Sequence, residues 1–266
     1  MSKTTKNLLS IGLVLLVLAT VYIFKFSFGL TPRLGLDLKG GVSLVYEAQG
    51  KKVDAGVLDK TVEKIRTRVD RLGVAEPEIT RQGARNVIVQ LPGIHDPERA
   101  KALVGKTAQL QFRLVQESKP AKEAAKDPAW KETPELERKK DAVVILPYAK
   151  GKDKVFYKLG PTLLTGDIIK KAQVAYDENG DPRIDFTTTD AGKKQFGDVT
   201  TANVNKQLAI VLDYVVESAP NIESAITEGK GQITGKFTEK EAKDVAIVLN
   251  IGALPFELTL ISEGNI

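Results

Sequence analysis

The sequence predicts an α+β protein built from two βαββαβ units of the ferredoxin-like type, with an inserted subdomain and one N-terminal transmembrane helix. Three observations support this class: an uncharged apolar run near the N-terminus, alternating strand and helix patterns after it, and a weak repetition of that order in the second half. The predicted segments are a cytoplasmic tail at 1–7, a transmembrane anchor at 8–30, a first unit at 31–115, an inserted or head region at 116–169 and a second unit at 170–266.

The apolar run near the N-terminus is long enough to cross a bilayer. Residues 8–24 carry no charge, and extending the run to residue 30 adds only Lys25, whereas a spanning helix needs about 20 mostly apolar residues. Lys3 and Lys6 precede the run, which predicts a cytoplasmic N-terminus and an extracytoplasmic bulk. A cleaved signal peptide is the alternative, but the exit at 25–29 lacks a small-residue cleavage pattern. We therefore expect an uncleaved, single-pass anchor in the cell membrane.

A glycine-containing stretch follows the apolar run. Its side chains alternate between apolar and polar as in a strand, and Gly40 and Gly41 then permit a bend or a close backbone approach. Gly35 and Gly40 have the spacing of a phosphate-binding loop, but Gly41 and Val42 stand where that loop needs Lys and Ser or Thr. Nucleotide binding is therefore not expected, and a glycine-bent strand is the better interpretation.

The first unit is predicted to run strand, helix, strand, strand, helix, strand. Asp54 is expected to cap the first helix, and Asp96 the second, with Pro97 in its first turn. The strands are expected at 42–48, 78–81, 86–91 and 108–115. In the last of these strands, alternation predicts that Leu110, Phe112 and Leu114 face the core and that Gln109, Gln111 and Arg113 face solvent.

The rest of the chain begins with an insertion rich in charge, alanine and proline, at 116–141, in which Trp130 is expected to be a local anchor rather than a partner contact. A hairpin with an Asn-Gly turn signal is predicted at 177–182. Further strands are expected at 143–146, 155–159, 174–176, 184–186, 208–212, 231–235 and 256–260, and helices near 190–199 and 242–249. The likeness of Pro77–Ile79 to Pro220–Ile222 supports the weak internal repeat.

The composition narrows the possible chemistry. The chain has 39 Lys and Arg against 34 Asp and Glu, a scattered net charge of +5 that does not form the basic face expected for nucleic acid. Absence of cysteine excludes disulfides and thiol chemistry. His95, the single histidine, is expected in an exposed loop, because a metal site needs several ligands. Asp37 suits a hydrogen bond at a turn or strand end better than catalysis. We expect neither an enzyme nor a bound cofactor or metal.

Five stretches carry a family resemblance. They read LGLDLKGGV at 34–42, RVDRLGVAEP at 68–77, LPG at 91–93, TAQLQF at 107–112 and GALP at 252–255. In this order they resemble the SecD family, accessory subunits of the bacterial Sec translocon. The resemblance covers nearly the whole chain except residues 116–165. It implies structural or conformational roles for Gly35, Asp37, Gly40, Gly41, Pro77, Pro92, Gly93, Leu254 and Pro255.

The resemblance implies a translocase subunit whose extracytoplasmic domain receives unfolded exported polypeptide, with SecF and the SecYEG channel as partners and the proton gradient as energy source. The chain matches the first membrane helix and first extracytoplasmic domain of such proteins. A proton path needs ionisable groups within the membrane, and the apolar run offers only Lys25 near its end. Gradient coupling is therefore expected of the full family protein and not of this chain alone. The alternative is an anchored binding or scaffolding domain without a motor role.

Overall fold

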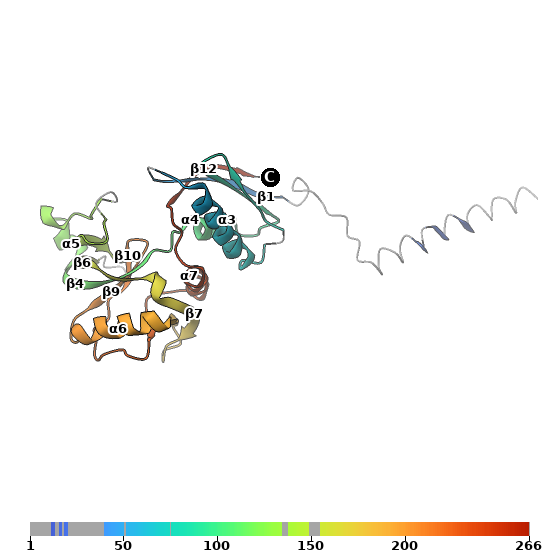
Figure 1. Cartoon of the computed structure of the whole chain (residues 1–266). Helices are drawn as coiled ribbons and strands as arrows, with labels where there is room; N and C mark the ends of the chain where they lie inside the picture. The colour runs from blue at the N-terminus through green and yellow to red at the C-terminus, as the bar shows by residue number, and fades with distance from the viewer. Residues whose placement is uncertain are drawn as a thin grey trace, which may run out of the picture. The chain divides into compact units, whose positions relative to one another are not determined.

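The computed structural model describes residues 12–13, 16–17, 19–20, 40–50, 52–74, 76–134, 138–148 and 155–265 (Figure 1). Contacts separate residues 41–266 from residues 1–40, and the fold below is that of the larger unit. The predicted anchor at 8–30 lies mostly outside the described residues, and Gly35 and Asp37 lie wholly outside them. Among the residues that are described, no helix has the length and apolar character needed to span a membrane.

The first lobe, residues 41–105 and 252–265, is a four-stranded antiparallel sheet with two helices. The sheet has the order β12-β1-β3-β2, and the predicted α+β class is confirmed. Asp54 caps the first helix by accepting a hydrogen bond from Val57 N at 3.1 Å, and Asp96 caps the second through Arg99 N at 3.0 Å. The elements are β1 (Gly41–Ala48), α3 (Ala55–Asp70), β2 (Glu78–Gln82), β3 (Asn86–Pro92), α4 (Pro97–Gly105) and β12 (Leu258–Asn265).

One strand of the predicted first unit belongs elsewhere. The stretch at 108–115 was expected to complete the first sheet, but β4 (Leu110–Pro120) pairs with β6 (Val155–Thr165) and β9 (Leu208–Leu212) instead. Strand β12, from the C-terminal end, occupies the place beside β1. The chain therefore leaves the first lobe through β4, builds the second lobe, and returns to close the first sheet, so the prediction of a self-contained unit ending at residue 115 is wrong.

The second lobe, residues 107–251, contains two sheets. A five-stranded sheet has the order β10-β9-β4-β6-β5, and a three-stranded sheet has the order β11-β8-β7. The predicted second βαββαβ unit is not formed, because its strands are divided among three sheets. The elements are β5 (Val144–Pro147), β6 (Val155–Thr165), β7 (Ile169–Tyr176), β8 (Pro182–Thr188), α6 (Asp190–Ala202), β9 (Leu208–Leu212), β10 (Val215–Ser218), β11 (Lys230–Ile233), α7 (Glu239–Ile251) and the short helices α5 (Ala121–Ala124), η1 (Pro128–Trp130) and η3 (Gly166–Ile168).

The first four residues of strand β4 are buried on both faces, which explains why alternation misplaced their polar side chains. Gln111 and Arg113, predicted to face solvent, are 3% and 0% exposed. Arg113 donates from Nε to Gln111 Oε1 at 2.8 Å and from Nη1 to the carbonyl oxygen of Gly160 at 2.9 Å. Because the guanidinium is hydrogen-bonded to these oxygen acceptors, a central strand can bury it without leaving an unpaired charged group. The sequence pattern of a half-exposed strand thus occurs here in a strand segment that is covered on both faces.

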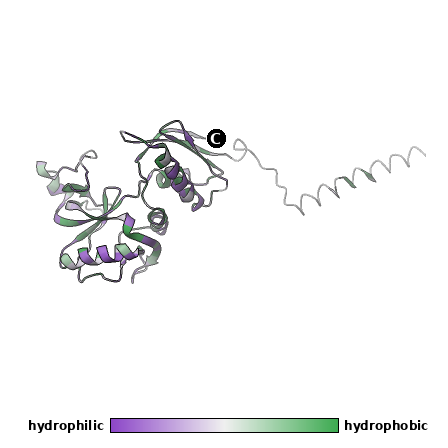
Figure 2. Cartoon of the chain, viewed as in Figure 1, coloured by the Kyte–Doolittle hydropathy of each residue, from purple (hydrophilic) through white to green (hydrophobic). Residues whose placement is uncertain are grey.

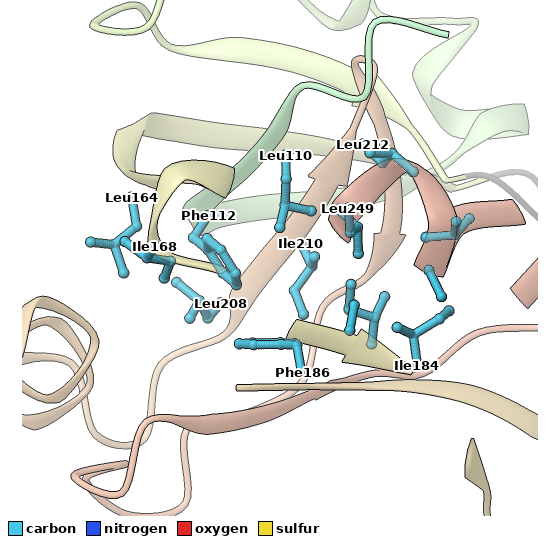
Figure 3. Packing of buried hydrophobic residues seen from close by; sticks show 14 of the residues in the cluster. Leu110, Phe112, Leu164, Ile168, Ile184, Phe186, Leu208, Ile210, Leu212 and Leu249 are labelled. Carbon is cyan, nitrogen blue, oxygen red and sulfur yellow. The ribbon is translucent and has the colours of Figure 1, made fainter. Parts of the chain in front are cut away.

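Separate apolar clusters hold the two lobes. In the first lobe, α3 and α4 pack on sheet residues such as Leu44 and Val89, with Ile65 of α3 fully buried. In the second lobe, residues of both sheets meet those of α6 and α7. Figure 3 shows residues of the two sheets together with Leu249 of α7. Figure 2 shows the alternation of hydrophobic and hydrophilic residues along α6, typical of a helix with one buried face. Trp130 is 6% exposed beneath Lys119 Nζ, 4.8 Å from the ring centroid, which confirms its local anchoring role.

Candidate functional site

The second lobe contains a groove of about 790 Å³. Strands β7, β8 and β11 of the three-stranded sheet line one part of it, and β4, β9, α6 and the segment at 220–226 line the rest. A concave surface of this size, apolar inside with polar groups around it, is the form that ligand sites usually take. We therefore regard this groove as the candidate functional site.

Three aromatic rings pack directly beneath the apolar lining of the groove. Phe112, Phe186 and Phe196 come from β4, β8 and α6, and their ring centroids lie 5.7–6.0 Å apart in each pair. All three side chains are at most 3% exposed. Figure 3 shows Phe112 and Phe186 approaching each other from the two sheets. The tilted and edge-on arrangements are those that aromatic pairs favour, so the inner surface is held in place by its own packing.

A glycine makes room for one of these rings. Gly231 of β11 lies opposite Phe186 of β8 in the sheet. A Cβ atom at Gly231 would lie only 2.3 Å from Phe186 Cζ, closer than any real carbon contact. Only glycine therefore allows the ring to cover the backbone of β11 at this point. The sequence pattern of residues 230–233 alone gave no sign of this requirement.

The segment at 220–226 forms a fixed wall of the groove. Ile222 is 4% exposed, and its N–H donates to the carbonyl oxygen of Lys206 at 2.9 Å. Ile226 N–H donates to Thr200 Oγ1 at 2.9 Å. Both bonds tie this segment to the region around α6, so the wall does not depend on a bound ligand for its position.

The rim of the groove is polar and carries both signs of charge. Lys171, Arg183 and Lys230 lie among its lining residues together with Asp185 and Glu223. Arg183 Nε donates to Asp185 Oδ1 at 2.9 Å, with side chains 30% and 36% exposed, so this ion pair contributes little stability. A mixed rim over an apolar interior favours apolar side chains of a flexible ligand over a small, highly charged one.

Arg68 fixes the junction between the lobes. This fully buried side chain donates from Nη1 to the carbonyl oxygens of Leu103, at 3.1 Å, and Lys106, and from Nη2 to that of Gly252 at 3.3 Å. Lys106 and Gly252 lie on the two segments that connect the lobes. Burial lowers the pKa of Arg68 to about 10, below its ordinary value, with Asp213 opposing the shift. Lys64 Nζ adds a bond to the carbonyl oxygen of Ala253 at 2.6 Å.

Ion pairs between α4 and α7 support the same junction. Arg99 donates from Nε and Nη2 to the Asp244 carboxylate, at 3.0 and 2.7 Å to Oδ1, and this hydrogen bonding raises the pKa of Arg99. Asp96 accepts a hydrogen bond from Lys240, which is the main reason that the pKa of Asp96 is lowered. The orientation of the second lobe is therefore held by several charged groups as well as by apolar contacts.

Among the described residues, the signature positions from Gly41 onward lie in the first lobe, and none of them lines the groove. Gly41 pairs with Pro92 at the end of the sheet, and a Cβ atom at Gly41 would lie 2.5 Å from the carbonyl oxygen of Leu91. Gly40 and Gly93 have φ angles of 65° and 63°, in the left-handed region that favours glycine. The conformational roles proposed for these glycines stay predictions.

The remaining signature residues lie at the edges of the same lobe. Leu254 is 2% exposed, and its N–H donates to the carbonyl oxygen of Thr107 at 2.8 Å, which joins the two connecting segments. Pro255 is exposed, and Pro77 directly precedes β2. His95 is exposed, and the described part of the chain contains no group of three or more potential metal ligands.

Sequence reasoning missed most of the groove. Phe112 was correctly expected to face a core, but nothing in the sequence linked it to Phe186 or Phe196. Their meeting depends on pairing between distant segments. The usable signal was the set of aromatic residues on inward positions of predicted strands and helices, which marks a core without showing which residues border a cavity.

Two protein-family models match the chain. The model described as the SecDF P1 head subdomain matches residues 144–256, and that described as the N-terminal P1 domain of protein translocase subunit SecDF matches residues 58–117. The protein translocase subunit SecD of Elusimicrobium minutum is 42% identical over 253 residues, covering 88% of this chain and 53% of that protein. SecDF of Thermus thermophilus is 39% identical over 262 residues, covering 95% of this chain and 34% of that protein.

Solved structures give the same result. A crystal structure of SecDF in a super-membrane-facing form has a TM-score of 0.68 at 36% identity, covering 98% of this chain and 35% of that one. A structure described as a membrane component SecDF that enhances protein export has a TM-score of 0.64 at 36% identity, covering 83% of this chain and 98% of that one. The chain spans about half the length, or less, of the SecD and SecDF relatives that it matches.

Proposed function

The chain belongs to the SecD/SecDF family of protein translocase subunits, and from this premise we propose that its groove binds unfolded polypeptide during export. The observation that carries the proposal is the groove itself, whose apolar lining is backed by three packed aromatic rings and bordered by a rim of mixed charge. An exported chain presents many different side chains, so a non-selective apolar surface suits it. This is a binding role without catalysis, metal or cofactor.

Site-specific crosslinking tests the groove directly. A photo-activated amino acid at Ser224, an exposed groove residue, is expected to crosslink to a polypeptide arrested in translocation. The matched control is the same amino acid at Lys122 on α5, which is also exposed but does not line the groove. Equal crosslinking at both positions, or none at Ser224 with an arrested polypeptide present, would contradict a binding role for the groove.

The cellular setting follows from the family. We propose that residues 8–30 anchor the protein in the cell membrane as a single uncleaved span, with the N-terminus in the cytoplasm and the two lobes outside. The positive charges before the apolar run support this orientation. SecF and the SecYEG channel are the proposed partners. Carbonate extraction followed by external protease tests the topology, and a soluble product that begins near Ser27 would contradict it.

Proton-gradient coupling is proposed for the full-length family protein and not for this chain alone. The apolar run carries no ionisable group except Lys25 near its end, and a proton path needs such groups within the membrane. In inverted vesicles that hold this chain as their only SecD-like component, a proton gradient is therefore expected not to increase any effect of the chain on export. Gradient-dependent stimulation by the chain would contradict this. If the chain crosslinks neither to polypeptide nor to SecYEG, the anchored scaffold without a transport role is favoured instead.

A further inference from the structure

The three-stranded sheet of the second lobe has two edge strands, β7 and β11, and its hydrogen bonding shows which backbone groups point outward. Thr188 N–H donates to the carbonyl oxygen of Gly229 at 2.8 Å, just before β11. In an antiparallel pair, directly hydrogen-bonded residues alternate with residues whose N–H and C=O point away. In the register of β11 with β8, Gly231 is therefore bonded to Phe186, while the backbone groups of Lys230 and Gln232 point to the free edge.

The opposite edge is covered by a side chain at one point. Ala172 of β7 lies opposite Phe186, whose backbone groups point to β11, so those of Ala172 point outward. Asn250 of α7 satisfies both of them, since Ala172 N–H donates to Asn250 Oδ1 at 2.9 Å and Asn250 Nδ2 donates to the Ala172 carbonyl oxygen at 2.7 Å. The amide of Asn250 thus imitates a neighbouring strand at this point of β7.

The β11 edge lacks such a cover in the described part of the chain. There, outside the sheet itself, no backbone or side-chain hydrogen bond involves the backbone of Lys230 or Gln232. Both residues are exposed and line the groove together with Gly231. The groove is also lined from both faces of the sheet, by Phe186 on the inner face and Asp185 on the outer. The groove therefore passes around an edge of the three-stranded sheet, and the β11 residues in its lining place that edge at β11.

We propose that polypeptide bound in the groove adds to the sheet as a further strand beside β11. This inference rests on the proposed function and specifies how the groove recognises its ligand. The outward groups of Lys230 and Gln232 provide two donors and two acceptors to any extended chain, whatever its sequence, as in other complexes formed by strand addition. Because only two residues of this four-residue strand face outward, the backbone hydrogen bonds give a low affinity. A low affinity suits a polypeptide that must be released.

Side-chain contacts add a preference with a two-residue period. A guest residue opposite Gly231 places its side chain on the same face as the Phe186 ring, which already covers the β11 backbone there. Neighbouring guest residues point to the opposite face, where β8 and β11 carry Asp185 and Gln232. Segments that alternate between apolar and polar residues are therefore expected to bind better than the same residues in scrambled order.

An N-methyl scan of the ligand tests strand addition on the unaltered protein. The probe is a short, fluorescently labelled, unstructured peptide of alternating valine and threonine, flanked by lysine, and its affinity for the full chain in detergent is measured by anisotropy. Methylation of a peptide amide that pairs with the β11 backbone is expected to weaken binding about 2- to 10-fold. Methylation of the alternate peptide amides, which point away from β11, is expected to have no effect. Equal effects at all positions, or none, overturn the inference.

A pair of variants tests the β11 side of the contact. Gln232→Pro removes one outward N–H without breaking a bond to β8, and proline is tolerated at such edge positions. Relative to Gln232→Ala, which loses the same side chain but keeps the N–H, it is expected to weaken binding of the probe peptide about 2- to 10-fold. Binding insensitive to Gln232→Pro and to N-methylation overturns strand addition alone. Failure of every unfolded peptide to bind the unaltered protein overturns the proposed function as well.

Discussion

Replacement of Phe112 gives the sharpest test of how the groove is built. This side chain is fully buried in β4, and its ring lies 6.0 Å from that of Phe186 and 5.7 Å from that of Phe196. Phe112→Ala removes the whole ring and leaves a cavity, which costs about 3–5 kcal/mol of unfolding free energy. Phe112→Leu keeps most of the apolar volume but loses both ring pairs, at about 0.5–1.5 kcal/mol each, so its cost is expected to be smaller.

The assay is guanidinium unfolding of the full chain in mild detergent, followed by the fluorescence of Trp130. This single tryptophan is 6% exposed in the second lobe, so it reports on the lobe that contains Phe112. Val143→Ala is the control, because Val143 is 46% exposed and surface changes usually alter stability by less than about 0.5 kcal/mol. If both Phe112 variants match the control, the rings do not form a packed inner surface and the reasoning about the groove fails.

Three further predictions concern the first lobe. Ile65→Ala should cost about 2–5 kcal/mol, because Ile65 is fully buried; an unchanged melting temperature would mean that this face of α3 is exposed. The folded state lowers the pKa of Asp96, so its pairing with Lys240 stabilises near neutral pH and the benefit disappears as the pH falls through that pKa; Asp96→Asn should therefore lower the melting temperature at neutral pH, with a difference from the unaltered protein that shrinks in acid. A chain of residues 1–115 lacks β12 and should show no cooperative unfolding by circular dichroism, whereas a sharp transition would contradict the observed sheet.

Local structure could be predicted because its causes lie close together in the sequence. Asp54 and Asp96 cap the helices expected after them, since each needs only an acceptor and a free N–H three residues on. The burial of Ile65 follows equally from helical periodicity. For these elements, short-range chemistry and the final fold agree.

Strand partners could not be predicted, because an alternating pattern shows that a strand exists and not which strand it joins. The stretches that became β4 and β12 both alternate, yet each joined a different sheet from the one expected. The buried pair of Gln111 and Arg113 shows the limit most clearly, since polar residues indicate solvent unless their partners are known. The groove has the same cause, because Phe112 meets Phe186 and Phe196 only after the sheets form.

The proposed function requires unfolded polypeptide to bind in the groove of the second lobe. Its most direct test is a titration of the full chain, labelled at isoleucine methyl groups, with an unfolded polypeptide, followed by nuclear magnetic resonance. Ile210, Ile222 and Ile226 line the groove, whereas Ile65 and Ile79 belong to the core of the first lobe. We expect the three groove methyl signals to shift with a common saturation curve while those of the first lobe stay in place. Shifts confined to the first lobe, or none in the groove at saturating polypeptide, would contradict it.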